Sequence, residues 1–157
     1  MLESEIRIGD NFTIEKGYTI TTLRNSLVEI GNDCMISYNV NIRTNDGHSI
    51  FDIHTGKNIN STDEICKKRK VKIGDHVWIG MNTLVMYGAD IESGSIVGAM
   101  SLVRSKIPNN CIAAGIPAKV IRKDIAWSRN NNSSDINECG EEYIHLTGNI
   151  NEVEILK

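Results

Sequence analysis

The feature that most constrains this chain is an aliphatic residue at every sixth position of a long central stretch. The positions are Ile73, Ile79, Val85, Ile91, Val97 and Val103. A period of six fits neither an amphipathic helix, which repeats every 3.6 residues, nor the simple alternation of a strand. It fits a three-sided prism in which each hexad supplies one short face and one corner. Three hexads then close one coil, and the coils stack.

The other hexad positions agree with this prism. Glycine follows the aliphatic residue at Gly74, Gly80 and Gly98. The fifth position is mostly small, with Val77, Thr83, Ala89, Ser95, Ser101 and Ile107. We expect the aliphatic residues to point inward, each contributing roughly 1.5–3 kcal/mol before entropy costs. Gly and Asn near the corners tolerate the backbone angles of a sharp bend.

The same spacing occurs earlier and is interrupted twice. It runs through Ile8, Ile14 and Ile20, and again through Ile30, Ile36 and Ile42. The spacing from Ile20 to Ile30 is ten instead of six, which predicts an irregular turn over residues 21–29. The polar, turn-rich segment between Ile42 and Ile73 predicts a loop, at about residues 45–70, extruded from the prism.

Composition excludes several classes of protein. The net charge of −3 gives no basic excess for nucleic-acid binding, and no run of eighteen apolar residues predicts a membrane span. The N-terminus lacks the basic and apolar regions of a secretory signal, so we expect a cytoplasmic protein. The four scattered cysteines have no zinc spacing and are expected to be free thiols.

Residues 1–125 resemble the hexapeptide-repeat acyltransferase superfamily, in its sugar O-acetyltransferase branch. The resemblance includes the closing Ala-Gly-Ile-Pro-Ala-Lys sequence at 114–119. The resemblance implies an all-β, left-handed parallel β-helix with an extruded loop, assembled as a homotrimer. A short helix is expected over Ile121–Arg129, within or beside a linker and tail at 126–157. The implied co-substrate is acetyl-CoA, without a metal.

The strongest local motif is Asn45-Asp46-Gly47-His48-Ser49-Ile50, which opens the loop. It resembles the Asp-x-His pattern of sugar O-acetyltransferases, in which the histidine is the general base. A sugar hydroxyl attacks a thioester poorly unless a base takes its proton, and imidazole does this near neutral pH. His48 is therefore the predicted catalytic base. Asp46 is expected to orient it, unless it faces elsewhere.

Four residues are candidates for the acceptor site: Asn45, His54, His76 and Trp78. Asn45 begins the motif, His54 lies in the loop, and Trp78 matches a residue close to the active site in the resembling family. His76 lies inside the regular repeat, so its alternative is a corner residue hydrogen bonded to its neighbours. The basic run at 67–70 suggests an anionic acceptor or the steering of CoA, or is simply a solvated loop end.

The donor site is inferred from the last coils. In the resembling family, acetyl-CoA lies between subunits and its pantetheine arm contacts the backbone, which favours small side chains. Gly80, Gly98, Ala99, Ala114 and Gly115 fit that expectation, although the repeat itself also requires small residues. Lys119, Arg122 and Lys123 are candidates for the CoA phosphates.

The function expected from these residues is O-acetylation of a sugar hydroxyl, with a capsular or lipopolysaccharide glycan as the favoured acceptor. Three alternatives stay open. A galactoside, serine or an antibiotic is another possible acceptor. A zinc enzyme on the same scaffold needs three histidines in phase, of which His48 and His76 are candidates. A binding solenoid without chemistry needs only the repeat.

Overall fold

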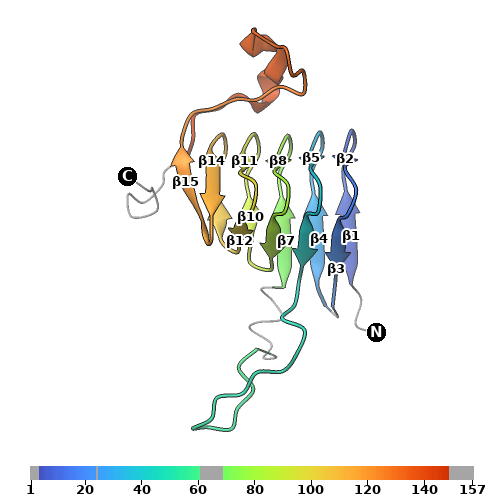
Figure 1. Cartoon of the computed structure of the whole chain (residues 1–157), viewed down its shortest axis with the longest axis vertical. Coiled ribbons are helices and arrows are strands. Elements are labelled where there is room, and N and C mark those ends of the chain that lie inside the picture. Colours follow the sequence, from blue (N-terminus) through green and yellow to red (C-terminus); the bar gives the residue numbers. More distant parts are fainter. Residues whose placement is uncertain (1–3, 24, 61–68, 149–157) are drawn as a thin grey trace.

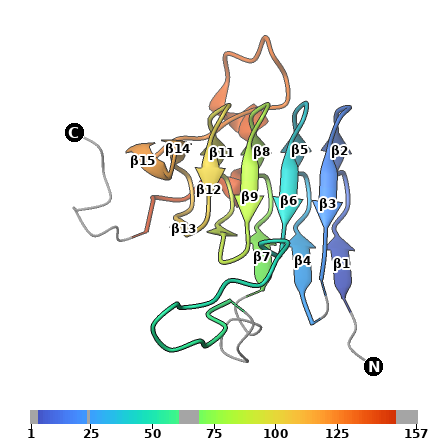
Figure 2. The same ribbon diagram turned by 60° about the horizontal axis from the view of Figure 1, so that its bottom comes forward.

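The computed structural model describes residues 4–23, 25–60 and 69–148. In these ranges, fifteen short strands stack as coils around one axis (Figures 1 and 2). The first sheet contains β1 (Glu5–Ile8), β4 (Leu27–Ile30), β7 (Lys70–Ile73), β10 (Asp90–Ile91) and β13 (Lys106–Ile107). The second contains β2 (Thr13–Ile14), β5 (Met35–Ile36), β8 (Trp78–Ile79), β11 (Ile96–Val97), β14 (Ile112–Gly115) and β15 (Ala118–Arg122). The third contains β3 (Thr19–Thr21), β6 (Asn41–Arg43), β9 (Leu84–Met86) and β12 (Leu102–Val103).

The register of these sheets confirms that three hexads close one coil. Ile73 lies beside Ile91, and Ile79 lies beside Val97 in the next sheet. Val85 lies beside Val103 in the third. All neighbouring strands run parallel except β14 and β15, which form an antiparallel hairpin at the end of the stack.

The core is the column of inward aliphatic residues that the repeat predicts. Ile36, Ile79, Val85, Ile91 and Val97 are fully buried. The small fifth-position residues Val77, Thr83, Ala89, Ser95 and Ser101 are also buried, at the corners beside that column. The inward and outward alternation along each strand therefore follows directly from the hexad.

Ile107 departs from the expected phase. The hexads put it in the small fifth position, but it pairs with Ile91 and belongs to the inward column of the first sheet. It follows Val103 after four positions because the corner between β12 and β13 is tighter than the earlier ones. The inward side chain at the start of the fifth coil is therefore Ile107, a residue that strict six-residue periodicity assigns to a corner.

The corner between the first and second sheets is built from residues with positive φ. Asn11, Asp33, His76, Gly94 and Asn110 occupy this corner in successive coils, with φ between 50° and 73°. Asn, Asp, His and Gly are the residue types that tolerate this left-handed conformation best. These five residues lie above one another in successive coils, and we call this row the first corner.

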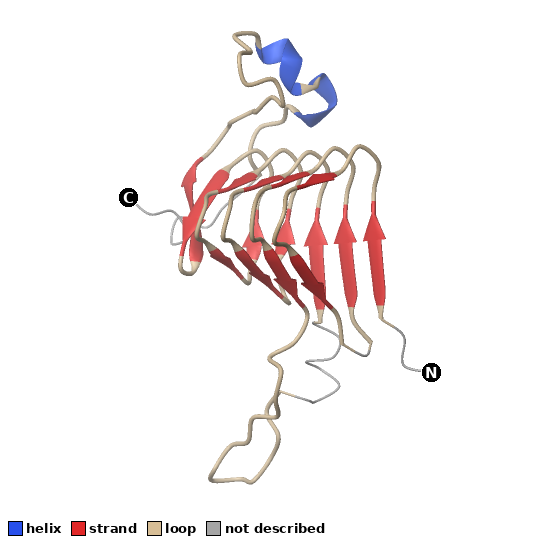
Figure 3. Cartoon of the chain, turned by 45° about the vertical axis from the view of Figure 1, so that its right-hand side comes forward, coloured by secondary structure: helices blue, strands red, loops and turns tan. Residues whose placement is uncertain are grey.

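Two segments leave the stack. Residues 44–60 run away from the coils between β6 and β7, as the teal ribbon of Figure 1 shows. The segment after β15 instead returns along the edge of the stack that carries the first corner (Figures 1 and 3). It contains two short 3-10 helices, η1 (Ile136–Cys139) and η2 (Glu141–Tyr143).

The helix expected over Ile121–Arg129 is not formed. β15 continues to Arg122, because its backbone pairs with β14, and the following residues are irregular. Trp127 is nevertheless buried, so the expected linker is fastened to the coils at this point. The last nine residues of the expected tail, 149–157, lie outside the described residues.

Three cysteines of the described chain, Cys34, Cys111 and Cys139, are buried and free, as predicted; Cys66 lies outside the described residues. Burial raises the pKa of the Cys34 and Cys111 thiols to about 11, so neither is a nucleophile near neutral pH. Within the described ranges, no helix has the length and apolar character needed to cross a bilayer.

Candidate active site at the base of the loop

The loop that carries the predicted base begins at two buried residues, Thr44 and Asn45, which we call the platform. Thr44 is fully buried, and its amide donates to the carbonyl of Thr21 at 3.1 Å. Its hydroxyl donates to Ser26 Oγ at 2.9 Å. Asn45 is 5% exposed, and its Nδ2 is buried without a hydrogen-bond partner among the described residues. An unpaired buried amide is costly, so Asn45 is a group whose burial calls for an explanation.

His48 lies just beyond this platform, after a turn at Gly47 with φ of 88°. It is exposed, and it lines a cavity of about 120 Å³. The other lining residues are Leu23, Asn45, Asp46, Gly47, Ser49, Asn60 and Arg69. No hydrogen bond joins the His48 imidazole to any residue that the structure describes, so the ring is free to act on a ligand. His54 is not among the described residues that line this cavity.

Asp46 does not orient His48 as expected. Both oxygens of its carboxylate accept from the Tyr87 hydroxyl, at 3.0 and 2.9 Å. Oδ2 also accepts from Asn60 Nδ2 at 3.2 Å. With these partners, the carboxylate faces the coils rather than the imidazole. Burial raises the pKa of the Tyr87 phenol, and the neighbouring Asp46 carboxylate raises it further, so the phenol keeps its proton.

A second cavity of about 230 Å³ adjoins the first and shares Asp46 with it. It lies on the outer face of the third sheet and is lined by Leu84, Met86, Tyr87, Leu102 and Arg104 as well. Apolar side chains therefore meet one carboxylate and one guanidinium beside the His48 cavity. Such a combination suits an elongated ligand with an apolar stem.

The structure corrects the assignment of His76 to the acceptor site and favours the corner alternative. His76 is 4% exposed at the first corner. Its Nδ1 lies 2.5 Å from Asp33 Oδ2, and its Nε2 lies 2.9 Å from the carbonyl of Trp127. The ring also stacks between Trp127 and Tyr143, with centroid distances of 4.0 and 4.6 Å. Neither nitrogen is left for a substrate.

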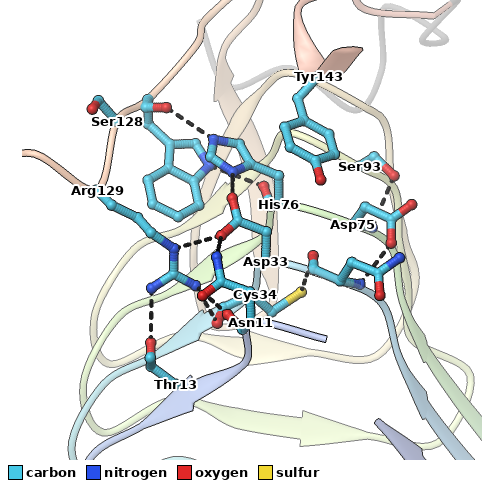
Figure 4. A network of polar contacts seen from close by, with 12 residues as sticks. Asn11, Thr13, Asp33, Cys34, Asp75, His76, Ser93, Ser128, Arg129 and Tyr143 are labelled. Carbon is cyan, nitrogen blue, oxygen red and sulfur yellow. Dashed lines mark hydrogen bonds and ion pairs between the residues drawn. The ribbon is translucent and has the colours of Figure 1, made fainter. Parts of the chain in front are cut away.

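Figure 4 shows that this corner is one polar network. The Arg129 guanidinium donates to Asp33 Oδ1 at 2.7 Å, and also to Thr13 Oγ1 and to the carbonyls of Asn11 and Cys34. Burial alone would raise the pKa of the Asp33 carboxyl. The hydrogen bonds and positive charges of His76 and Arg129 outweigh burial and hold that pKa below its usual value.

Sequence reasoning missed Asp33, Arg129, Trp127 and Tyr143 as members of this network. One signal was available: Asp33 and His76 hold equivalent positions after the Gly of their hexads, so stacking had to bring them together. No repeat covers Arg129 and Trp127, because they lie beyond the coils.

Trp78 lies apart from His48 within one chain. It sits on the outer face of β8 in the second sheet, where its Nε1 donates to Ser37 Oγ at 3.5 Å. Its ring centroid is 5.9 Å from that of Trp127. The described lining of the His48 cavity does not include it.

The residues assigned to the donor gather at the end of the second sheet. A Cβ added to Gly80 would lie 2.6 Å from the amide nitrogen of Ala99. One added to Gly98 would lie 2.9 Å from Ala114 Cβ. Stacking therefore requires both glycines, whether or not a ligand binds there. Ala114 pairs with Lys119 in the β14–β15 hairpin, next to Gly115. Arg122 and Lys123 follow on the exposed end of β15.

Among the described residues, no three His, Cys, Asp or Glu side chains come together as a metal site requires. His48 and His76 belong to different surroundings, one in the loop cavity and the other inside the first-corner network.

A model of the bacterial transferase hexapeptide, built of six repeats, matches residues 70–105. The chain is 40% identical over 147 residues to a polysialic acid O-acetyltransferase of Escherichia coli O1:K1 / APEC, covering 92% of this chain and 46% of that protein. The chain belongs to the hexapeptide-repeat transferase superfamily. Residues 70–105, which run from β7 to just past the end of β12, are the repeats that this model matches.

Two solved structures from this superfamily are similar in fold to this chain. The polySia specific acetyltransferase NeuO matches with a TM-score of 0.77 and 40% identity, over 85% of this chain and 59% of NeuO. The polysialic acid O-acetyltransferase OatWY matches with a TM-score of 0.69 and 28% identity, over 89% of this chain and 71% of OatWY. The chain spans about half the length of the curated relatives it matches, with 46%, 60% and 55% for three of them.

Proposed function

We propose that this chain is an acetyl-CoA-dependent O-acetyltransferase that acts on a hydroxyl of an anionic bacterial surface glycan. The observation that carries the proposal is His48. Its imidazole has no hydrogen-bond partner among the described residues. It lines a polar cavity beside the hexapeptide coils. The similarity to polysialic acid O-acetyltransferases supports this substrate class.

In the proposed reaction, His48 is the general base. The acceptor hydroxyl oxygen bonds to the thioester carbonyl carbon while its proton passes to the imidazole. The carbon–sulfur bond then breaks, and the departing thiolate takes up the proton that His48 holds. Acetyl ester and CoA are the products, and no covalent enzyme intermediate forms. Such a base contributes roughly a hundred- to ten-thousand-fold in rate.

The donor is proposed to lie along the end of the second sheet and the outer face of the third. Gly80, Gly98, Ala99, Ala114 and Gly115 would let the pantetheine arm approach the backbone. Lys119, Arg122 and Lys123 would face its phosphates. The apolar cavity formed by Leu84, Met86 and Leu102 lies between this end and His48, which supports such a path.

The acceptor is proposed to enter the His48 cavity. The unpaired Nδ2 of Asn45 would donate to a sugar oxygen, and Arg69 would contribute positive charge. His54, exposed in the loop, is a further proposed contact. In the basic run, Arg69 and Lys70 are described, whereas 67 and 68 lie outside the described residues.

The proposed assembly is a cytoplasmic homotrimer in which residues 1–125 form a left-handed β-helix domain and 126–157 a linker and tail. One surface supports association. Tyr38 and Met81 stack at the corner between the second and third sheets, and Met100 lies at the same corner one coil later, in register with Asn82. Tyr38, Met81 and Met100 are 48%, 50% and 68% exposed. An exposed apolar ridge of this kind favours packing against another subunit. That packing would bring Trp78 of one subunit toward His48 of another.

The proposal is tested by following free thiol release from acetyl-CoA with polysialic acid, lipopolysaccharide, a galactoside, serine and an antibiotic as acceptors. We expect release with an acidic glycan and a loss of about a hundredfold or more in His48→Ala. His145→Ala, at an exposed histidine of the C-terminal segment, is the matched control and should keep most activity. Release only with a small acceptor would support the alternative substrates. A folded protein that releases no thiol would support a binding solenoid instead.

A further inference from the structure

The main chain around His48 is held by two side chains outside its motif, one from the coils and one from the returning limb of the loop. The first is Tyr87, which follows β9 and is half-buried. Its hydroxyl donates to the Asp46 carboxylate, with 3.0 and 2.9 Å to the two oxygens. Since Tyr87 belongs to a stacked coil, this contact fixes the start of the loop to the rigid part of the molecule.

The second side chain is Asn60, on the returning limb of the loop. Its Nδ2 donates to the His48 carbonyl at 2.8 Å and to Asp46 Oδ2 at 3.2 Å. Its Oδ1 accepts from the amide of Ile50 at 2.9 Å. The carbonyl of Asn60 in turn accepts from Arg69 Nη2 at 3.0 Å. One amide group therefore holds the backbone at and just after His48, and also contacts the Asp46 side chain that precedes it.

We propose that Tyr87 and Asn60 are positioning residues that fix the main chain on either side of His48 and so aim its imidazole at the acceptor hydroxyl. The inference rests on the proposed function. The ring has no partner of its own among the described residues, so the backbone decides where it points. A displacement of about 1 Å in a reacting group costs on the order of a hundredfold in rate.

The first test measures kcat and KM in Tyr87→Phe and Asn60→Ala, with Tyr18→Phe, at an exposed tyrosine of the first coil, as the matched control. We expect kcat to fall about tenfold in Tyr87→Phe and about a hundredfold in Asn60→Ala, with KM for acetyl-CoA unchanged. In a His48→Ala background, neither substitution should lower the residual rate further. An additional loss in that background, or a rise in acceptor KM with kcat unchanged, would overturn the inference.

The second test does not depend on activity. Amide hydrogen exchange at Ile50 reports the bond that Asn60 Oδ1 accepts. We expect faster exchange in Asn60→Ala, and a smaller acceleration in Tyr87→Phe, with no change at core amides such as that of Val97. Unchanged exchange at Ile50 in both variants would refute the positioning role. If the wild-type protein releases no thiol with any acceptor, the proposed function fails, while the Ile50 measurement still decides whether these side chains hold the loop.

Discussion

Nδ1 of His76 lies 2.5 Å from Oδ2 of Asp33, its neighbour at the same corner of the preceding coil. Arg129 bonds the other oxygen of that carboxylate from the returning C-terminal segment. Trp127 and Tyr143 cover the two faces of the imidazole. The Asp33 carboxylate is therefore the point where two coils and the C-terminal segment are joined.

The first prediction concerns acid stability and Asp33→Asn. Because the folded-state pKa of Asp33 is lowered, its contribution is present above the ordinary carboxyl pKa of about 4 and is lost as pH falls through the lowered value. Asp33→Asn should lose about 1–3 kcal/mol of unfolding free energy at pH 7. Its stability should also fall less steeply below about pH 4 than that of the wild type. Urea unfolding between pH 2.5 and 7 measures both effects.

Asp10→Asn is the control for that experiment. Asp10 is an exposed carboxylate near the same corner, and we expect a change within about 0.5 kcal/mol. Equal acid sensitivity of the wild type and Asp33→Asn would show that the His76 and Arg129 contacts do not set the pH dependence.

The second prediction is that lysine does not replace Arg129. The planar guanidinium reaches Asp33, Thr13 and two backbone carbonyls at once, whereas an ammonium group is a single compact donor. Arg129→Lys should lose about 1–3 kcal/mol and expose residues 130–135 to proteolysis. Arg122→Lys, on the exposed end of β15, should match the wild type. Equal protease resistance of Arg129→Lys and Arg122→Lys would show that the Arg129 guanidinium does not hold the C-terminal segment against the coils.

The hexads predicted most of the fold because each coil repeats the same physical requirement. One inward aliphatic and one small corner residue per face suffice to set the register of Ile79 with Val97 and of Val85 with Val103. The prediction was wrong for Ile107, since one shortened corner shifts the phase without changing residue types. It was also wrong for the helix over Ile121–Arg129, where pairing of β15 with β14 overrides local preference.

The site was predicted less completely. The motif located His48 and Asn45 beside one cavity, because they are neighbours in sequence. The partners of Asp46 could not be predicted, since Tyr87 lies one coil later and Asn60 at the far limb of a loop of irregular conformation. The burial of His76 likewise depends on Trp127 and Tyr143, which no repeat places.

The third prediction separates stacking from donor binding at the end of the second sheet. Gly80→Ala would put a Cβ 2.6 Å from the backbone of Ala99, so the coils must shift. We expect a loss of about 1–3 kcal/mol without any ligand present, measured by denaturant unfolding. The exposed Ala99 has room for change, and Ala99→Leu should alter stability by less than about 0.5 kcal/mol.

If acetyl-CoA lies along this surface, Ala99→Leu should raise KM for acetyl-CoA several-fold while the protein remains as stable as the wild type. A normal KM in that variant would remove Ala99 from the donor site. Loss of stability in Ala99→Leu, in contrast, would show that Ala99, like Gly80, is needed for close packing of the coils.

The last prediction concerns the buried amide of Asn45. Its Nδ2 has no partner among the described residues, so the folded protein bears a desolvation cost there without a compensating hydrogen bond. Asn45→Leu has nearly the same shape without the polar group. We therefore expect its melting temperature to equal or exceed that of the wild type.

If Nδ2 donates to the acceptor, kcat/KM for the acceptor should fall about tenfold to a hundredfold, the value of one buried hydrogen bond. Thermal unfolding and thiol release on the same preparation distinguish the outcomes. A less stable variant with unchanged kcat/KM would mean that Asn45 serves the base of the loop and not the acceptor. A variant that gains stability as it loses activity would identify Asn45 as a group kept at a cost to the fold because the reaction uses it.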